Sequence, residues 1–298
     1  MSEVSFKSGF VSIIGAPNVG KSTLLNHLIG QKIAIVSPKP QTTRNRILGI
    51  KTTVDYQIIF LDTPGIHQAR SDINLALVRT ALSPLETVDL ILFVVEAHEP
   101  ENADNDYVLE ALHRVGTNVL LVINKTDRVR PEALSRVMAS SEGRYPFKGA
   151  VPISALHGSG VDDLLAWIVD LLPAGPAYYP HDTVTDLSER FICAEIIREK
   201  ILHLTSEEVP YAVAVTVASF KEDPERNLIH IQADIHVERP SQKAILIGKG
   251  GTMLRRIGQQ ARLDMENLLG ARVFLEIFVR IQKKWRKDPR ALREFGYQ

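Results

Sequence analysis

The sequence predicts two domains, an α/β domain with a mostly parallel sheet and one antiparallel strand, followed by a small α+β domain. Three observations lead to this prediction. The chain has 298 residues, which is long for one compact domain. Strand-like and helix-like segments alternate over residues 1–172, which is typical of βαβ units. Prolines and glycines then punctuate residues 173–187, which we interpret as a linker, and a different pattern fills residues 188–298.

Short apolar runs bounded by turn residues are expected to form the buried strands of the first domain. These runs are Phe10–Ile14, Gln57–Leu61, Leu90–Glu96, Val119–Ile123 and Ala150–Ile153. Helical spacing of apolar residues predicts helices at Lys21–Ile29, Ala103–Val115, Pro131–Ser141 and Val161–Leu172. One more strand, Ile47–Thr52, precedes the Gln57 strand with only Thr53–Tyr56 between them. Because that connection is too short for a crossover helix, these two strands should pair antiparallel.

The second domain is expected to follow the order helix, strand, strand, helix, helix, strand. Its middle strand, Leu228–Glu238, alternates apolar and polar residues, and two helical segments follow at Ser241–Ile247 and Thr252–Leu269. The last strand places these apolar residues on one face: Val273, Leu275, Ile277, Val279 and Ile281. Strands that are covered by helices on one face form a small α+β domain.

The composition is that of an ordinary globular protein, with 45% apolar and 23% charged residues. The single cysteine, Cys193, excludes a disulfide framework, and its apolar helical surroundings favour a core position. The start of the chain lacks the apolar stretch of a secretory signal, and the apolar runs are too short to span a bilayer. We therefore expect a soluble, cytoplasmic protein.

The formal net charge of zero hides an asymmetry along the chain. Residues 181–238 carry 5 Lys or Arg against 12 Asp or Glu, whereas residues 239–298 carry 14 against 5. A local excess of positive charge attracts phosphate backbones, although a solvated basic face is the alternative interpretation.

The segment Gly15–Ser22 reads G-x-x-x-x-G-K-S between an apolar strand and a helix, which is the context of a phosphate-binding loop. Its glycines let backbone N–H groups curl around a β-phosphate, and the helix N-terminus adds its dipole. In such a loop Lys21 supplies positive charge to the β- and γ-phosphates, and the Ser22 hydroxyl coordinates Mg²⁺.

Three further loops complete the predicted nucleotide site. Asp62–Gly65 reads DTPG, Asn124–Asp127 reads NKTD and Ser154–Leu156 reads SAL, each at the carboxyl end of a predicted strand, where open α/β sheets bind ligands. The Asp62 carboxylate can hold the metal through water, and the Gly65 amide can meet the γ-phosphate. The residues expected to contact the nucleotide are Gly15, Ala16, Pro17, Asn18, Val19, Gly20, Lys21, Ser22, Thr23, Asp62, Thr63, Pro64, Gly65, Ile66, Asn124, Lys125, Thr126, Asp127, Ser154, Ala155 and Leu156.

Asp127 selects the base. Its carboxylate can accept hydrogen bonds from the ring N–H and the exocyclic amine of guanine together. Adenine offers neither donor in that arrangement and would leave the carboxylate buried and unpaired, a discrimination on the order of 10⁴ or more. The expected ligand is therefore GTP or GDP with Mg²⁺.

The segment Gly248–Gly251 reads GKGG and separates the two helical segments of the second domain. Glycines there allow close approach to a nucleic-acid backbone, and the following helix N-terminus favours phosphate. A simple turn is the alternative interpretation, but the element order, which resembles a type II KH domain, and the basic charge favour RNA binding. The residues expected to bind RNA are Gly248, Lys249, Gly250, Gly251, Arg255, Lys283, Lys284, Trp285 and Arg286. For Trp285 two interpretations stay open, since its ring either stacks on a base or completes the hydrophobic core.

The motifs GAPNVGKS, QTTR, DTPG, NKTD and SAL, together with the KH-like half, resemble the Era family of bacterial translation-factor-class GTPases over almost the whole chain. This resemblance implies that Gln41–Arg44 is the first switch, with Thr43 the preferred ligand of Mg²⁺ and the γ-phosphate and Thr42 its rival. It implies Lys21, Thr43, Gly65 and Asn18 as the catalytic set, and small-subunit (16S) ribosomal RNA and the 30S subunit as partners. A monomer is expected.

Two residues bear on the chemistry. Ile66 stands where Ras-like enzymes place a water-orienting glutamine, and an isoleucine cannot polarise water. The neighbouring His67 is the weaker candidate for that role. In potassium-activated relatives an asparagine at the position of Asn18 binds a monovalent cation in place of an arginine finger, and the resemblance carries that role to Asn18.

We therefore expect a GTP-hydrolysing factor of 30S assembly that couples nucleotide state to ribosomal RNA binding. The alternative is a non-catalytic guanine-nucleotide switch whose basic end docks on a protein or on acidic lipid at the inner face of the membrane.

Overall fold

The computed structural model describes residues 5–39, 42–66, 81, 85–141 and 143–296. By their internal contacts these residues fall into two units. The first ends at Ala34 and resumes from Thr43 to Asp186, and the second comprises Ile35–Thr42 and the chain from Leu187 onwards. Among the described residues no helix combines the length and the apolar character that crossing a bilayer requires.

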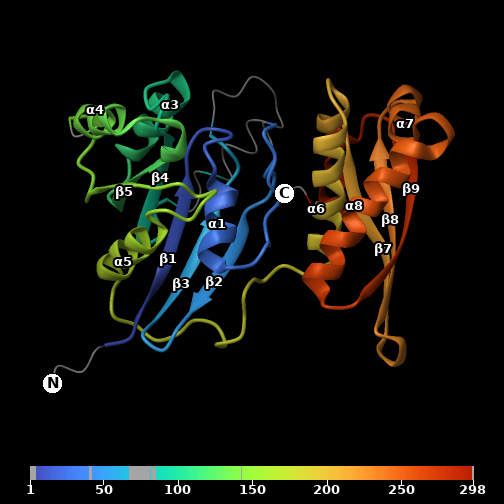
Figure 1. Cartoon of the computed structure of the whole chain (residues 1–298), viewed down its shortest axis with the longest axis horizontal. Coiled ribbons are helices and arrows are strands. Elements are labelled where there is room, and N and C mark those ends of the chain that lie inside the picture. Colours follow the sequence, from blue (N-terminus) through green and yellow to red (C-terminus); the bar gives the residue numbers. More distant parts are fainter. Residues whose placement is uncertain (1–4, 40–41, 67–80, 82–84, 142, 297–298) are drawn as a thin grey trace. The chain divides into compact units, whose positions relative to one another are not determined.

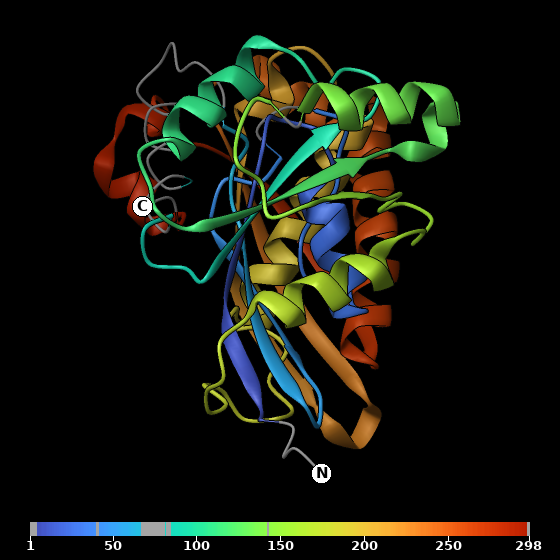
Figure 2. The same cartoon turned by 90° about the vertical axis from the view of Figure 1, so that its left-hand side faces the viewer.

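The first unit is built on a six-stranded sheet with the order β2-β3-β1-β4-β5-β6 (Figure 1). Its strands are β1 Lys7–Ile14, β2 Ile47–Thr52, β3 Tyr56–Asp62, β4 Leu90–Glu96, β5 Asn118–Asn124 and β6 Ala150–Pro152. Its named helices are α1 Lys21–Ile29, α3 Ala103–Leu112, α4 Pro131–Ser141 and α5 Val161–Leu171. The β2–β3 pair is antiparallel and the other pairs are parallel, which confirms the predicted sheet. Strands β1 and β3 run side by side in both views (Figure 2).

Helices cover both faces of this sheet, which is why its strands are continuous apolar runs. One face packs α3 and α4 through Val108, Leu112 and Val137 against Ile91 and Phe93 of β4. The buried leucines of α1 and α5 lie on the other face. Gly49 of β2 shows how close that packing is, because a Cβ there would come within 2.9 Å of the Leu25 side chain of α1.

The segment expected as a linker makes specific contacts with the first unit. The Gln57 side chain accepts from the amides of Tyr178 and Tyr179 at 2.6 and 2.9 Å. The Thr185 hydroxyl donates to the Leu48 carbonyl of β2 at 2.6 Å. Residues 173–186 therefore follow the sheet as an ordered strap, and the division at 172 and 188 remains our proposal for the domain boundaries.

The second unit is a three-stranded sheet, β7-β8-β9, with three helices packed on one face. Its elements are α6 Glu189–Leu204, β7 Ala214–Asp223, β8 Leu228–Val237, α7 Pro240–Ile247, α8 Thr252–Leu269, β9 Arg272–Ile281 and a short α9 Pro289–Glu294. The β7–β8 pair is antiparallel and the β8–β9 pair is parallel. The predicted order of helices and strands is confirmed, while α9 was not expected.

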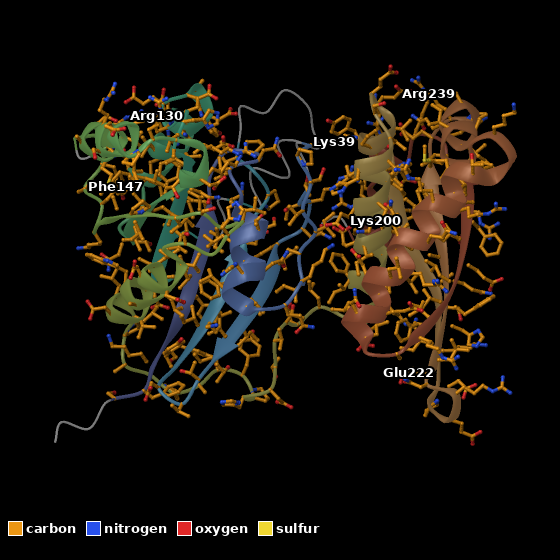
Figure 3. The ribbon with its side chains drawn as sticks, in the orientation of Figure 1. Lys39, Arg130, Phe147, Lys200, Glu222 and Arg239 are labelled. Atoms are coloured by element: carbon orange, nitrogen blue, oxygen red, sulfur yellow. The ribbon has the colours of Figure 1, made fainter. Side chains whose placement is uncertain are left out.

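Apolar and polar residues alternate along β8, and the apolar ones form the core of this unit. Ile231, Ala233 and Ile235 are fully buried against α6 and α8, where Cys193 and Met265 also have no exposed surface. Burial raises the pKa of the Cys193 thiol to about 12. The two helices are also joined by an ion pair between Lys200 of α6 and Asp264 of α8 at 2.5 Å; Figure 3 labels Lys200.

The stacking interpretation of Trp285 is wrong. Its ring is fully buried against Ala214, Ala291 and Phe295, and its indole N–H donates to the Ala212 carbonyl at 3.2 Å. A ring without exposed surface cannot stack on a base. The tail after β9 therefore folds back and closes one end of the sheet.

We expect Trp285→Ala to destabilise the second unit by about 3–5 kcal/mol, because it removes a fully buried ring and orphans the Ala212 carbonyl. Urea unfolding followed by circular dichroism measures this change, with Phe274→Ala, a half-exposed aromatic of the same unit, as the matched control that should cost clearly less. Unchanged stability together with lost RNA binding would reinstate the stacking role.

Candidate nucleotide site and nucleic-acid surface

The loop between β1 and α1 has the backbone conformation of a phosphate cradle. Gly20, Gly15 and Asn18 have φ of 101°, 152° and 64°. A Cβ on Gly15 would lie 2.3 Å from the Val94 carbonyl oxygen, so only glycine fits there. Lys21 is 6% exposed, and its ammonium donates to the carbonyls of Gly15 and Ala16 at 3.0 and 2.8 Å. Burial lowers the pKa of Lys21 to about 8, so it stays largely charged at neutral pH.

The residues predicted to hold Mg²⁺ lie together. The Ser22 hydroxyl donates to Asp62 Oδ2 at 2.6 Å and is 2.8 Å from the Thr43 hydroxyl. Asp62 is fully buried, and its Oδ1 has no hydrogen-bond partner among the described residues. Burial raises the pKa of Asp62 to about 6 despite the Ser22 hydrogen bond. A hard divalent cation fits this set, because it would use the two hydroxyls and satisfy the buried carboxylate.

The two candidate threonines differ in their surroundings. Thr43 is 7% exposed and lies against Ser22, whereas the Thr42 hydroxyl donates to the Lys39 carbonyl at 2.6 Å. This geometry favours Thr43 over Thr42 as the metal ligand. Gln41 and His67 lie outside the described residues.

The DTPG loop packs closely on the phosphate loop. A Cβ on Gly65 would lie 2.8 Å from Pro17 Cα, and the Ile66 amide donates to the Gly15 carbonyl at 3.1 Å. The Ile66 side chain is fully buried in the core, so only its backbone faces the site. Thr63 is buried too and donates to the Ile13 carbonyl at 2.9 Å.

Asn124 joins three loops. Its amide nitrogen donates to the Val19 carbonyl at 2.7 Å, and its oxygen accepts from the Ala155 amide at 2.9 Å. The next residue, Lys125, has φ of 64° and donates to the Asn18 carbonyl at 2.7 Å. Both residues of the NKTD motif therefore brace the phosphate loop.

The carboxylate that is predicted to select the base is exposed and preorganised. Asp127 Oδ1 accepts from the Ser154 hydroxyl at 2.6 Å, which lowers the pKa of Asp127 and keeps it ionised. Thr126 donates its amide to the Ile153 carbonyl at 3.1 Å. Leu156 is 69% exposed at the same rim. An ionised acceptor held at the rim is what guanine recognition requires.

The sequence analysis missed Glu96. This residue ends β4 and forms an ion pair with Lys125, while its other oxygen lies 3.0 Å from His98 Nδ1. A carboxylate that follows a buried strand at the same sheet edge as the motifs was the available signal. Glu96 fixes the lysine that braces Asn18.

In the second unit the GKGG loop opens helix α8. Gly248, Gly250 and Gly251 all have positive φ, of 72°, 59° and 77°. Gly251 caps the N-terminus of α8, where free amides and the helix dipole favour a phosphate. A Cβ on Gly250 would meet nothing within 4 Å, so its face is open to a ligand.

Beside this loop a groove of about 340 Å³ runs between α8 and β9. Its apolar floor and basic rim suit bases and phosphates respectively. It is lined by Gly251, Leu254, Arg255, Gly258, Gln259, Arg262, Leu275 and Ile277. Arg255 was predicted to bind RNA; the floor residues were missed, because they read only as core-facing positions. In the tail, Lys283 and Lys284 are exposed, whereas Arg286 pairs with Glu238.

Two family models match the chain. A model described as 50S ribosome-binding GTPase matches residues 10–125, and a KH domain model matches residues 208–286. These matches cover the phosphate loop in the first unit and the GKGG loop in the second.

The chain is similar over its full length to proteins named GTPase Era. It is 55% identical over 298 residues to the one from Geotalea uraniireducens and 54% identical over 297 residues to the one from Geobacter metallireducens, each covering 100% of both chains. A solved structure of Era in complex with MgGDPNP and nucleotides 1506–1542 of 16S ribosomal RNA superimposes with a TM-score of 0.94, at 41% identity over 98% of this chain and 99% of that one. An Aquifex aeolicus Era variant bound to GDP and AlF₄⁻ gives 0.93, at 40% identity over 98% and 99%.

We expect Asp127→Asn to weaken GTP binding on the order of 10²-fold or more, because two charge-assisted hydrogen bonds are lost. Xanthine nucleotides should bind better than GTP to this variant, since an amide can donate to the carbonyl that replaces the guanine amine. Calorimetry with GTP and XTP measures both, and Ser154→Ala, which removes only the orienting hydroxyl, is the control. Unchanged GTP affinity of the asparagine variant would contradict the base assignment.

Proposed function

Because this chain belongs to the Era family of GTPases, with a P-loop GTPase domain followed by a KH domain, we propose that it binds small-subunit ribosomal RNA and acts in assembly of the 30S subunit. The observation that carries the proposal is the groove between α8 and β9, where an apolar floor, two arginines and the open GKGG loop meet. A relative with the same fold over 98% of this chain holds 16S ribosomal RNA.

The nucleotide side of the proposal assigns GTP with Mg²⁺ to the first unit. Ser22 and Thr43 would ligate the metal, and Asp62 would accept from its water. When bound, Mg²⁺ supplies positive charge against the phosphate oxygens. Lys21 would leave its backbone acceptors for the β- and γ-phosphates, because its pKa of about 8 keeps it charged.

Hydrolysis in this site proceeds without a glutamine next to Gly65. Ile66 is buried, so no side chain at that position orients the water. The chain offers the Gly65 amide, the Lys21 ammonium and the Asn18 side chain as groups that stabilise charge on the transferred phosphate. Following the resemblance to potassium-activated relatives, we assign Asn18 a potassium ion; its backbone lies in the left-handed region, and its carbonyl accepts from Lys125.

The RNA side of the proposal assigns single-stranded RNA to the groove. Gly248, Lys249 and Gly250 would bring backbone and charge to the phosphates, while Arg255 and the exposed Lys283 extend the basic surface.

Chain connectivity supports coupling between nucleotide and RNA. In the second unit the Thr42 carbonyl accepts from the buried Arg198 of α6. Thr43, the next residue, lies against Ser22 in the first unit. A change at the metal site that displaces Thr43 therefore acts on a carbonyl held by α6. Because coupling free energies are reciprocal, RNA should alter nucleotide affinity as much as nucleotide alters RNA affinity.

We place this monomeric factor in the cytoplasm.

If Asn18 holds potassium against the developing charge, hydrolysis should be faster in potassium than in sodium at equal ionic strength, by on the order of tenfold. Asn18→Ala should remove the difference. Steady-state phosphate release in the two salts measures it. Equal rates for the wild-type protein would exclude the ion site without touching the base assignment.

Replacing Lys249 and Gly250 with Asp should abolish RNA binding, because two carboxylates then face the phosphates. Folding and GTP affinity should change little, since a Cβ on Gly250 meets nothing within 4 Å and aspartate is among the side chains that tolerate the left-handed φ of 59° there. Filter binding across a salt series measures affinity; each neutralised phosphate of a single strand contributes a log–log slope of about −0.7.

The matched control for this variant places the same two changes, Lys148→Asp and Gly143→Asp, in the first unit, where Gly143 also faces open space. If the Lys249 and Gly250 variant folds and still binds 16S-type RNA like the wild type, the GKGG loop is only a turn, and the basic tail becomes the candidate surface.

A further inference from the structure

The sheet of the second unit has an outer face that the proposed function leaves unused. The helices and the RNA groove lie on the other face, to which Leu275 and Ile277 of β9 point. The alternate positions of β9 carry Arg272, Phe274, Glu276, Phe278 and Arg280. The two phenylalanines are 51% and 44% exposed, and large apolar side chains left open on one face of a sheet mark an interaction surface.

The chain itself occupies one end of this outer face. Ala214 of β7 and His236 of β8 are paired there, and both meet the C-terminal segment: Ala214 packs with Trp285, and the His236 ring lies 4.3 Å from Phe295. That segment is basic, with six Lys or Arg and one acid between Lys283 and Arg293. The outer face therefore already binds a basic segment with apolar anchors at one end.

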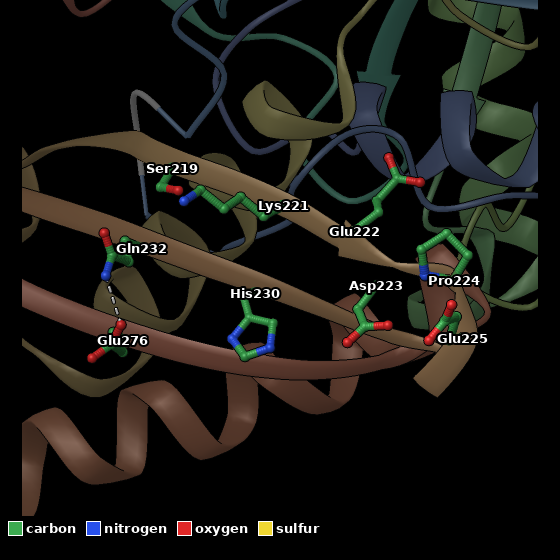
Figure 4. Close-up of a pocket in the computed structure, with 9 residues that line it drawn as sticks. All are labelled: Ser219, Lys221, Glu222, Asp223, Pro224, Glu225, His230, Gln232 and Glu276. Carbon is green, nitrogen blue, oxygen red and sulfur yellow. Dashed lines mark hydrogen bonds between the residues drawn. The ribbon is translucent and has the colours of Figure 1, made fainter.

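The open end carries complementary charge. Next to Phe274, a hollow of about 610 Å³ is lined by four carboxylates, one ammonium and His230 (Figure 4); one of the carboxylates, Asp223, also pairs with Arg226 at 3.8 Å. Its lining residues are Ser219, Lys221, Glu222, Asp223, Pro224, Glu225, His230, Gln232 and Glu276. The His230 ring lies 5.4 Å from the Phe274 ring, which makes a π surface at the edge of the hollow. A guanidinium suits this combination of carboxylates and aromatic faces.

We propose that the open outer face binds an extended, arginine- or lysine-rich segment of another protein. Apolar side chains of the segment lie over Phe274 and Phe278, and a basic side chain enters the hollow between Glu225 and Glu276. An extended segment of about nine residues spans about 30 Å, the length of β9. The surface thus gives the protein a protein-docking site on the face opposite its RNA groove.

The same charges argue against a nucleic acid on this face. A phosphate backbone crossing the rings would pass the carboxylates of the hollow, and like charges at short range are unfavourable. Arg280, whose guanidinium carbon lies 5.4 Å from the centre of the Phe278 ring, is already paired with Asp234 at 3.0 Å. The outer face is therefore less suited to a nucleic acid than to a basic peptide.

The test uses the full chain and a fluorescein-labelled nonapeptide in which arginine alternates with leucine. Fluorescence anisotropy should show binding, and the same peptide with glutamate in place of arginine should not bind. Two double variants should each weaken binding about tenfold or more: Phe274→Ser with Phe278→Ser, and Glu225→Gln with Glu276→Gln. The matched controls are Leu263→Ser, an equally exposed apolar residue of α8, and Glu110→Gln with Glu132→Gln in the first unit; both should retain wild-type binding.

GTP turnover and affinity for single-stranded 16S-type RNA should be unchanged in all of these variants, and circular dichroism verifies that each folds. Equal peptide affinity of the phenylalanine variant and the wild type overturns the proposal. Loss of RNA binding in that variant overturns it in favour of a nucleic-acid surface. Self-association of the wild type that the phenylalanine variant removes, measured by sedimentation, overturns it in favour of a second copy of the chain.

Discussion

The side-chain amide of Asn124 is the interaction on which the nucleotide site depends. It is 2% exposed and links the carbonyl of Val19 to the amide of Ala155, so one residue at the end of β5 fixes the phosphate loop and the SAL loop together. A Cβ on Gly20 would lie 2.2 Å from its nitrogen, which shows how little room the arrangement leaves. Because buried polar groups without partners are costly, removing this amide would release both loops at once. Lys125 and Glu96 extend the same brace to Asn18.

The second unit shapes its predicted phosphate-binding loop through backbone geometry at a helix start, and not through side-chain hydrogen bonds between loops. Three glycines of positive φ, Gly248, Gly250 and Gly251, turn the chain from α7 into α8, and the free amides at the start of the new helix lie beside the groove. The sheet separates two surfaces of different chemistry. Its helix side presents arginines beside an apolar floor, and its outer side presents phenylalanines beside carboxylates.

Local patterns predicted most of the fold, and long-range contacts account for what they missed. Lys21–Ile29, Pro131–Ser141 and Thr252–Leu269 form helices with the predicted bounds, because spacing and capping residues act within one turn. The position of Trp285 was undecidable, since its partner Ala212 is 73 residues away in the chain. The strap after Pro173 was interpreted as a linker, because its local sequence does not show that the Gln57 side chain accepts a hydrogen bond from it. In the nucleotide site, motif spacing predicted which loops converge. The roles of Glu96 and of the groove floor could not be predicted, because they depend on contacts between residues that are distant in the sequence.

Because Cys193 is buried, its rate of chemical labelling can be used to measure how often the small domain opens. Only a thiolate reacts with disulfide reagents or maleimides, and a thiol with a pKa of about 12 and no exposed surface offers almost none. Labelling must then wait until the core around Cys193 opens, so the labelling rate reports the opening of the small domain. Since the chain has a single cysteine, that rate is free of competing signals. If nucleotide or RNA makes opening of the small domain rarer, Cys193 should be alkylated more slowly, and no engineered label is needed to measure that rate.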